Sequence, residues 1–112
     1  MVIYFSSDKL MAIFNDEKSL RRKYGQLTAK IQQRMSELQA ASSLSIIFQY
    51  PPAHCHELKG SDKGKFAVNV SGNYRLIFRP CDEPIPTKED GGIDLTKVTE
   101  VCILEVVDYH SD

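Results

Sequence analysis

The chain has 112 residues, of which 42% are apolar and 26% are charged, and its net charge is −1. This length predicts one domain, and no apolar run approaches the roughly 20 residues that a membrane-spanning helix needs. The opening Met-Val-Ile-Tyr-Phe is too short and uncharged for a secretory signal, and the three scattered cysteines form no Cys-x-x-Cys pair. We therefore expect a cytoplasmic protein without membrane contact, disulfides, metal or other cofactors.

The first half of the chain predicts one strand followed by helices. Its opening residues are apolar and β-prone, Ser6 to Asp8 offer N-caps to a first helix, and Gly25 ends a second helix. The predicted strand and three helices span 2–5, 9–14, 17–24 and 26–41. Residues 42–50 fit either a helical turn or an extended stretch, which Pro51-Pro52 end because neither proline continues a regular ladder.

The second half predicts strands, at 66–71, 74–79 and 99–109. Gly72-Asn73 is typical of a hairpin turn, and 54–65 fit a loop or the start of a strand. Three prolines and five acidic residues between 80 and 97 predict an exposed excursion near 80–98. The order β-α-α-β-β-β predicts one α+β domain over 1–112, with N-terminal helices packed on one face of a small, mostly antiparallel sheet.

Charge is distributed unevenly along the chain. Residues 54–79 carry five Lys or Arg against two Asp or Glu, together with His54 and His56, whereas residues 80–112 carry two against nine. The middle segment is therefore a candidate phosphate-facing patch on a protein that is nearly neutral overall. The alternative is that these are ordinary solvated surface charges.

Three motifs together carry a resemblance to a known family. They are the loop Leu58-Lys59-Gly60-Ser61-Asp62-Lys63-Gly64-Lys65-Phe66, the strands Val68-Asn69-Val70 and Tyr74-Arg75-Leu76-Ile77-Phe78, and the terminal Val106-Val107-Asp108-Tyr109-His110. With these motifs the chain resembles the HigB-like "killer protein" branch of the RelE/ParE toxin superfamily. The resemblance covers the whole chain in length and element order, and it is specific at 51–79 and 104–110.

The resemblance implies the toxin of a type II toxin-antitoxin system. Such a toxin is a ribosome-dependent mRNA endonuclease that inhibits translation and is held inactive by its cognate antitoxin. The RNA 2′-hydroxyl attacks the neighbouring phosphate without a metal, which leaves a 2′,3′-cyclic phosphate and a 5′-hydroxyl. The implied antitoxin carries a helix-turn-helix domain, so promoter DNA is bound only through the toxin-antitoxin complex.

Four residues are the catalytic candidates: Arg75, His110, Tyr109 and Asp108. The planar guanidinium of Arg75 suits a phosphate, and we expect the flanking Tyr74 to pack inward while Arg75 projects to the opposite face. His110 matches the terminal histidine of the family and can transfer a proton near neutral pH. Tyr109 is suited to stacking on a base or donating to a phosphate, and Asp108 to orienting His110 or capping the sheet.

Five further residues are candidates for binding RNA phosphates: Lys59, Lys63, Lys65, His54 and His56. The lysines lie in a glycine-bounded loop and would add affinity without sequence choice. Either histidine fits the position that some relatives place near the site. A metal site built from His54, Cys55 and His56 is disfavoured, because the cysteine of an extended segment faces away from its two neighbours.

Two other functions remain open at this stage. A ParE-like toxin that inhibits gyrase without cutting RNA shares the fold, but that branch usually lacks the histidine and tyrosine at the C-terminus. An inactive relative that serves only as a protein-binding module is also compatible with the sequence. Cleavage of mRNA distinguishes the leading interpretation from both alternatives.

Overall fold

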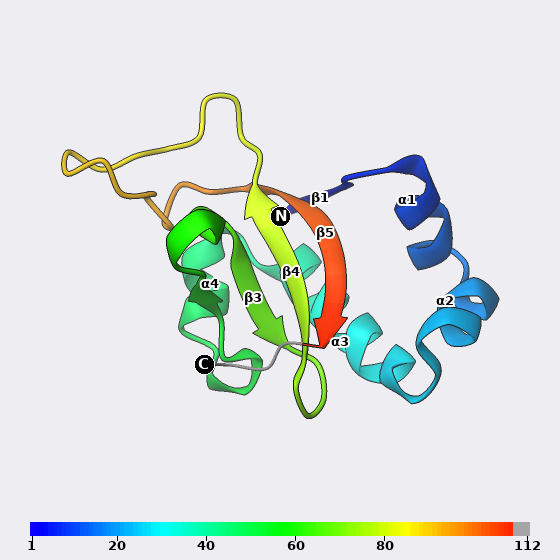
Figure 1. The fold of residues 1–112 in the computed structure, drawn as a ribbon. Coiled ribbons are helices and arrows are strands. Elements are labelled where there is room, and N and C mark those ends of the chain that lie inside the picture. Colours follow the sequence, from blue (N-terminus) through cyan, green and yellow to red (C-terminus); the bar gives the residue numbers. More distant parts are fainter. Residues whose placement is uncertain (109–112) are drawn as a thin grey trace.

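A five-stranded sheet forms the centre of the computed structural model, which describes residues 1–108 (Figure 1). Its strands are β1 (Val2–Phe5), β2 (His56–Glu57), β3 (Phe66–Asn69), β4 (Tyr74–Pro80) and β5 (Glu100–Asp108). They lie in the order β1-β5-β4-β3-β2, with β1 parallel to β5 and the other neighbouring pairs antiparallel. The predicted α+β class with a mostly antiparallel sheet is confirmed.

Within the described residues, the four α-helices precede β2 in the chain, and one of the three 3-10 turns follows it. They are α1 (Asp8–Phe14), α2 (Glu17–Tyr24), α3 (Thr28–Ala40) and α4 (Leu44–Phe48), with 3-10 turns η1 (Gly25–Leu27), η2 (Pro51–Ala53) and η3 (Gly60–Asp62). Side-chain caps start the first two, since Ser7 accepts from the Leu10 amide at 3.0 Å. Asp16 likewise accepts from the Ser19 amide at 3.2 Å. None of the helices in residues 1–108 is long and apolar enough to cross a membrane.

Tertiary hydrogen bonds decide the ambiguous stretch 42–50, which forms the short helix α4. The Leu44 amide donates to the Val98 carbonyl at 3.1 Å, and the Ser45 amide donates to the Leu95 carbonyl at 3.1 Å. These bonds satisfy amides that a helix N-terminus leaves without intrahelical partners. The partner carbonyls lie some fifty residues further along the chain, so the local sequence could not reveal them.

The excursion near 80–98 is largely exposed, as expected, but its two ends are buried. Val98 is fully buried, and only 9% of the surface of Asp82 is exposed. The Asp82 carboxylate accepts from the Thr99 amide at 2.9 Å and from the Thr99 hydroxyl at 3.0 Å. Both ends of the excursion are therefore anchored, while its middle extends away from the sheet (Figure 1).

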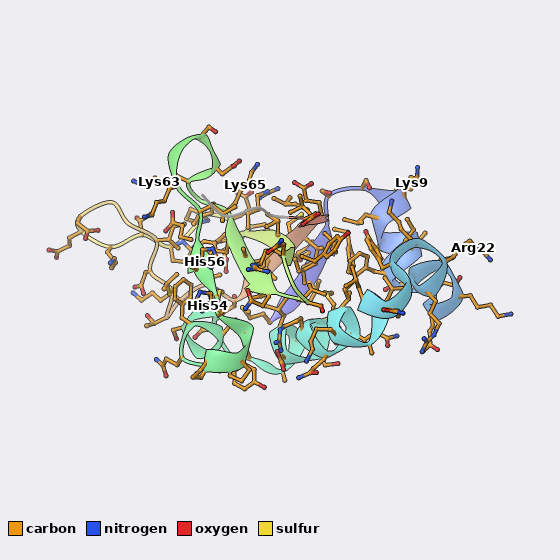
Figure 2. All side chains as sticks on the ribbon, turned by 60° about the horizontal axis from the view of Figure 1, so that its bottom comes forward. Lys9, Arg22, His54, His56, Lys63 and Lys65 are labelled. Carbon is orange, nitrogen blue, oxygen red and sulfur yellow. The ribbon has the colours of Figure 1, made fainter. Side chains whose placement is uncertain are left out.

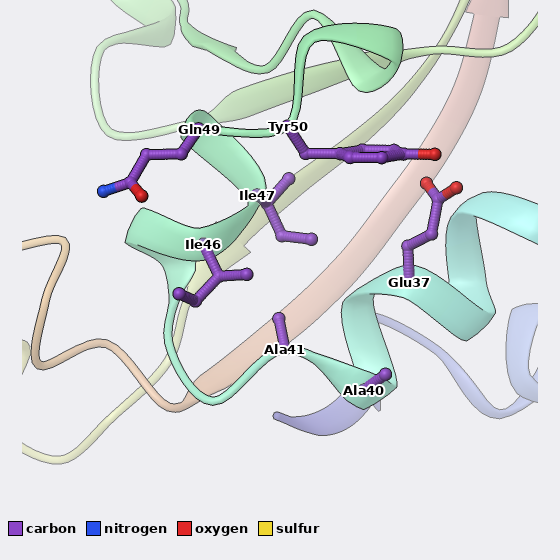
Figure 3. Close-up of a pocket in the computed structure, with 7 residues that line it drawn as sticks. All are labelled: Glu37, Ala40, Ala41, Ile46, Ile47, Gln49 and Tyr50. Carbon is purple, nitrogen blue, oxygen red and sulfur yellow. The ribbon is translucent and has the colours of Figure 1, made fainter.

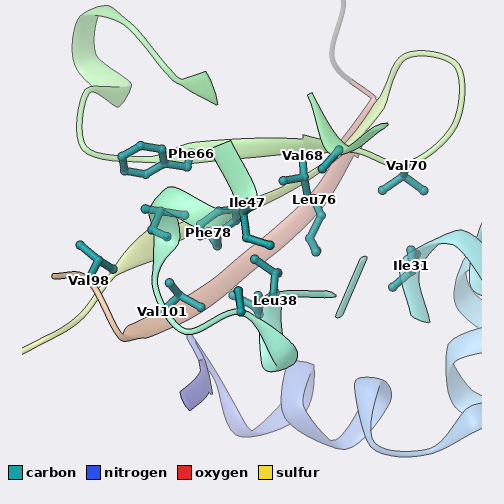
Figure 4. Packing of buried hydrophobic residues seen from close by; sticks show 14 of the residues in the cluster. Ile31, Leu38, Ile47, Phe66, Val68, Val70, Leu76, Phe78, Val98 and Val101 are labelled. Carbon is teal, nitrogen blue, oxygen red and sulfur yellow. The ribbon is translucent and has the colours of Figure 1, made fainter. Parts of the chain in front are cut away.

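The main hydrophobic core lies between the sheet and the helices (Figure 4). Phe66 of β3 and Phe78 of β4 are fully buried, and their rings stack with centroids 5.9 Å apart. Ile31 and Leu38 of α3 pack into the same cluster. The core therefore fixes the backbone of the β3–β4 hairpin to the helical layer.

The predicted Gly72-Asn73 turn joins β3 to β4. Gly72 has a positive φ of 55°, which favours glycine, and the Val70 amide donates to the Tyr74 carbonyl at 3.0 Å. Leu76 is fully buried as expected, but the expectation that Tyr74 packs inward is wrong, since 38% of its surface is exposed. Tyr74 is the first residue of the strand after the turn and pairs with the exposed Asp108, so it lies at the rim of the core.

Candidate functional site

The sheet face opposite the helices carries most of the predicted site residues. We call it the outer face; its residues on β2 to β5 include His56, Ala67, Asn69, Arg75, Ile77 and Val107. The alternation of side chains along each strand separates these residues from the helix-side core. Ala67 and Ile77 accordingly form a second small cluster with Leu58, against which Leu104 and Val107 pack.

Arg75 lies in the middle of a cross-strand row on the outer face, between Asn69 on β3 and Val107 on β5. Its side chain is half-buried, and Nη1 donates to the carbonyls of Gly72 and Tyr74, each at 2.9 Å. Within residues 1–108, Nε and Nη2 have no hydrogen-bond acceptor. The hairpin turn thus holds one corner of the guanidinium and leaves the other donors available to an anion.

His54 and His56 lie close together but differ in backbone conformation and in strand pairing. His54 has a left-handed φ of 47° and ends η2, whereas His56 pairs with Ala67 in the row next to that of Arg75. Their ring centroids are 5.6 Å apart, and Nδ1 of His56 lies 3.1 Å from the His54 carbonyl (Figure 2). A carbonyl only accepts, so Nδ1 carries the hydrogen in this contact and a neutral ring has its lone pair on Nε2.

The lysine loop owes its shape to its glycines. Gly60 and Gly64 have positive φ values of 65° and 96°, which explains the glycine spacing of the motif. The Leu58 amide donates to the Lys65 carbonyl at 2.8 Å and closes the loop at its base. The Gly64 amide also donates to the Glu57 carboxylate at 3.0 Å.

The three lysines of this loop differ in their partners. Lys65 forms an ion pair with Asp62 at 3.1 Å, so part of its charge is already compensated. Lys59 and Lys63 are exposed, and neither has an ion-pair partner in the part of the chain that the structure describes. Figure 2 shows Lys63 and Lys65 on the loop that follows His56. The loop therefore presents cations beside the outer face.

The end of β5 brings Asp108 next to the hairpin. Asp108 pairs with Tyr74, one position beyond the pair of Arg75 and Val107. Because successive residues of a strand point to opposite faces, Asp108 and Arg75 leave the sheet on opposite sides. Tyr109 and His110, the other two catalytic candidates, lie outside the described residues.

A sequence model of the HigB-like toxins, described as the RelE-like toxin of the type II toxin-antitoxin system HigB, matches residues 3–87. The chain belongs to this family. Membership makes it a toxin of a type II toxin-antitoxin system, which confirms the sequence interpretation, and it supports an antitoxin partner and, in general terms, ribonuclease activity.

The fold of this HigB-like toxin is similar to that of a solved structure, the YoeB-YefM complex from Staphylococcus aureus. The similarity has a TM-score of 0.55 and 16% sequence identity, and it covers 99% of this chain and 98% of that chain. At this identity the similarity establishes the fold alone. A comparison with curated protein sequences found no match.

Two thiols of the HigB-like toxin are poor nucleophiles at neutral pH. Burial raises the pKa of Cys55 to about 12, and burial together with the nearby Cys102 raises the pKa of Cys81 to about 11. Nucleophilic chemistry and metal binding both need a thiolate, so these values count against either role. Across residues 1–108, no three His, Cys, Asp or Glu side chains cluster as metal ligands do.

Sequence reasoning missed one residue that contacts the site backbone, Arg34 of α3. Only 4% of its surface is exposed, and its position three residues after Ile31 and four before Leu38 places it on the buried side of the helix. Its guanidinium donates to carbonyls of two distant segments. The helical spacing from Ile31 and Leu38 signals the burial of Arg34 but not its partners, because both acceptors are backbone atoms far along the chain.

Proposed function

We propose that this toxin is a ribosome-dependent mRNA endonuclease that inhibits translation and cleaves without a metal ion. The observation that carries the proposal is the placement of a guanidinium and an imidazole on the same outer face of the sheet, at Arg75 on β4 and His56 on β2, with β3 between them. A cation and a proton-transfer group on one sheet face are what attack by an RNA 2′-hydroxyl requires.

The reaction has three roles to fill. A base takes the proton of the 2′-hydroxyl, whose oxygen then bonds to the adjacent phosphorus while the bond to the 5′-oxygen breaks. An acid returns a proton to that 5′-oxygen, so the products are a 2′,3′-cyclic phosphate and a 5′-hydroxyl. Cations stabilise the charge that grows on the phosphate oxygens in between.

We assign Arg75 to the phosphate and His56 to proton transfer. The Nη2 and Nε donors of Arg75, which have no acceptor within residues 1–108, suit two phosphate oxygens, and the tautomer of His56 leaves Nε2 as the basic atom. His110 is proposed as the second proton-transfer group, with Tyr109 as a stacking or donating residue and Asp108 in a supporting role. His54 then acts mainly through its carbonyl, which orients His56.

Lys59 and Lys63, with Lys65 as a weaker contributor, are proposed to bind phosphates of mRNA or ribosomal RNA. Their loop adjoins the outer face, and the first two have no ion-pair partner within residues 1–108. The cognate partner is proposed to be a helix-turn-helix antitoxin whose complex with the toxin binds promoter DNA, in the cytoplasm. The YoeB-YefM complex, whose fold is similar, is a parallel for such a pairing.

The deciding experiment uses a reconstituted translation reaction. Ribosomes carry an mRNA with either a natural or a 2′-deoxy nucleotide at the cleaved position, and the toxin is wild type, Arg75→Ala or His56→Ala. We expect cleavage of the natural mRNA by wild type alone, with a 2′,3′-cyclic phosphate end. Cleavage that persists at the 2′-deoxy position would contradict attack by the 2′-hydroxyl.

The control variant is Arg79→Ala, an exposed arginine on the same strand. It should cleave like wild type and melt like Arg75→Ala. Growth arrest in cells with intact mRNA would favour a gyrase-directed toxin instead. Absence of both arrest and cleavage would favour an inactive binding relative.

A further inference from the structure

Arg34 is a buried cation that the proposed chemistry does not use. Its Nη1 contacts both carboxylate oxygens of Glu37, at 2.9 and 3.1 Å. Its Nε donates to the Asn69 carbonyl at 2.7 Å, and its Nη2 donates to the Pro52 carbonyl at 2.8 Å. All three guanidinium nitrogens are therefore engaged, and the ionic partner offsets the cost of burying the charge.

The two carbonyls belong to the two halves of the candidate site. Asn69 is the cross-strand partner of Arg75. Pro52 lies in η2, the turn that leads into His54 and His56. One guanidinium thus bonds to the backbone on both sides of the site, from the helical layer beneath it.

The segment that carries His56 has little other support from the sheet. β2 consists of two residues, and its pairing with β3 is limited to His56 with Ala67 and Glu57 with Phe66. A ladder this short is a weak restraint on the strand. Beside the buried Ala53 and the bond from the Leu58 amide to Lys65, the bond from Arg34 to Pro52 is a further attachment, four residues before His56.

The fork of the guanidinium is what allows this arrangement. Three nitrogens in one plane reach three acceptors in fixed directions, whereas a lysine ammonium is a single point on a flexible stem. The ion pair with Glu37 fixes the orientation of the guanidinium plane. Glu37 itself lies at the rim of a hollow of about 450 Å³ between α3 and α4. Figure 3 shows the side chains of Glu37 and Tyr50 directed toward one another at this rim.

We propose that Arg34 is a positioning residue of the nuclease, which sets the placement of His56 relative to Arg75 by holding the backbone of both segments. The proposal rests on the function proposed above. It makes Arg34 important for the rate of the chemical step and unimportant for substrate binding, because the guanidinium is buried beneath the site and touches no substrate.

The test compares Arg34→Lys with Arg21→Lys, the same change at an exposed arginine of α2. The toxins are purified from their antitoxin complexes, the folded fraction is measured by circular dichroism, and cleavage on programmed ribosomes gives kcat per folded molecule and KM. We expect kcat of Arg34→Lys to fall about 10- to 100-fold, as for a misplaced catalytic group. KM should stay within about twofold, and Arg21→Lys should match wild type.

An unchanged kcat per folded molecule for Arg34→Lys would overturn the proposal, because a purely structural arginine changes the folded fraction alone. If the wild-type toxin does not cleave, the proposed function itself fails. If wild type and Arg34→Lys are equally active, the proposed function stands and only the role of Arg34 fails. Should Arg34→Lys not fold, hydrogen exchange of the arginine Nε–H groups in wild type decides. Protection of Arg34 relative to Arg21 supports the clamp, and equally fast exchange overturns it.

Discussion

Asn69 and Arg75 face each other across the β3–β4 hairpin, and each forms hydrogen bonds with a different part of the protein. Arg75 bonds to the hairpin turn, whereas the carbonyl of Asn69 accepts from Arg34 of the helical layer. The candidate phosphate-binding residue therefore sits on a hairpin that is braced from below. Such support from a second layer is what keeps a catalytic side chain in place during a reaction.

Replacing Arg75 by lysine should reduce cleavage although it keeps the positive charge. A lysine head cannot offer two parallel donors to a phosphate, so we expect the single-turnover cleavage rate to fall about 100- to 1000-fold, as for the loss of one transition-state donor. The rate is measured on ribosomes programmed with a labelled mRNA. The Arg79→Lys variant is the control, and a wild-type rate for Arg75→Lys would show that a point charge suffices.

Removing the charge of Lys59 should weaken ribosome binding in a salt-dependent way. Each phosphate contact contributes about 0.7 to 0.9 to the slope of log affinity against log salt. We expect the slope for Lys59→Ala to decrease by about this amount. Binding is measured by filtration between low and physiological salt. Lys97→Ala, at an exposed lysine far along the chain, should keep the wild-type slope, and an equal loss there would contradict a specific role for the loop.

Truncating Phe66, one ring of the stacked pair in the core, should strongly destabilise the fold. Phe66 is fully buried between Phe78 and Phe48, whose ring centroids lie 5.9 and 5.7 Å from its own. We expect Phe66→Ala to lower the free energy of unfolding by about 3–5 kcal/mol in urea titrations. Ile46→Ala, at a side chain that is 46% exposed, should change it by less than about 0.5 kcal/mol.

The half-buried thiol of Cys55 should make the stability of the fold depend on pH in the alkaline range. Its pKa is raised from 9.0 to about 12 by burial, so the unfolded chain loses this proton first as pH rises. Stability from this group is fully present below pH 9 and falls between pH 9 and 12. Urea titrations across this range should show a shallower decline for Cys55→Ala than for wild type.

Alkylation of the native protein gives an independent check on the same thiol. Reaction with iodoacetamide proceeds through the thiolate, so at pH 8 we expect Cys55 to react far more slowly than it does in urea. Peptide mass spectrometry identifies the modified residue. Rapid modification of Cys55 in the folded protein would contradict its raised pKa.

Local patterns in the sequence were sufficient for the regular elements that determine the fold. The Gly72-Asn73 turn, the strand that follows it and the helix over 17–24 all depend on signals within a few residues. The outer-face position of Arg75 also followed from strand alternation, since the register pairs it with Asn69. The prediction for Tyr74 failed because alternation gives the side of the sheet but not how far the helices cover it.

Features that depend on distant backbone atoms could not be predicted from the sequence. Arg34 lies on the helix face of the buried Ile31 and Leu38, but the carbonyls that it binds are 18 and 35 residues away in the chain. The proposal of His56 rather than His54 rests on the pairing of β2 with β3, which is too short to leave a pattern in the sequence. The anchoring of Asp82 likewise depends on Thr99, across the whole excursion.

The pairing of β1 with β5 has a consequence for the order in which the toxin is made. The Ser6 hydroxyl contacts the Leu104 carbonyl across a separation of 98 residues, and β5 is the strand that joins β1 to β4. Such non-local contacts form slowly and only after the intervening chain has emerged. Until β5 has been synthesised, the row that carries Arg75 lacks its neighbour Val107. The outer face therefore reaches its full set of strand neighbours only once β5 has been made.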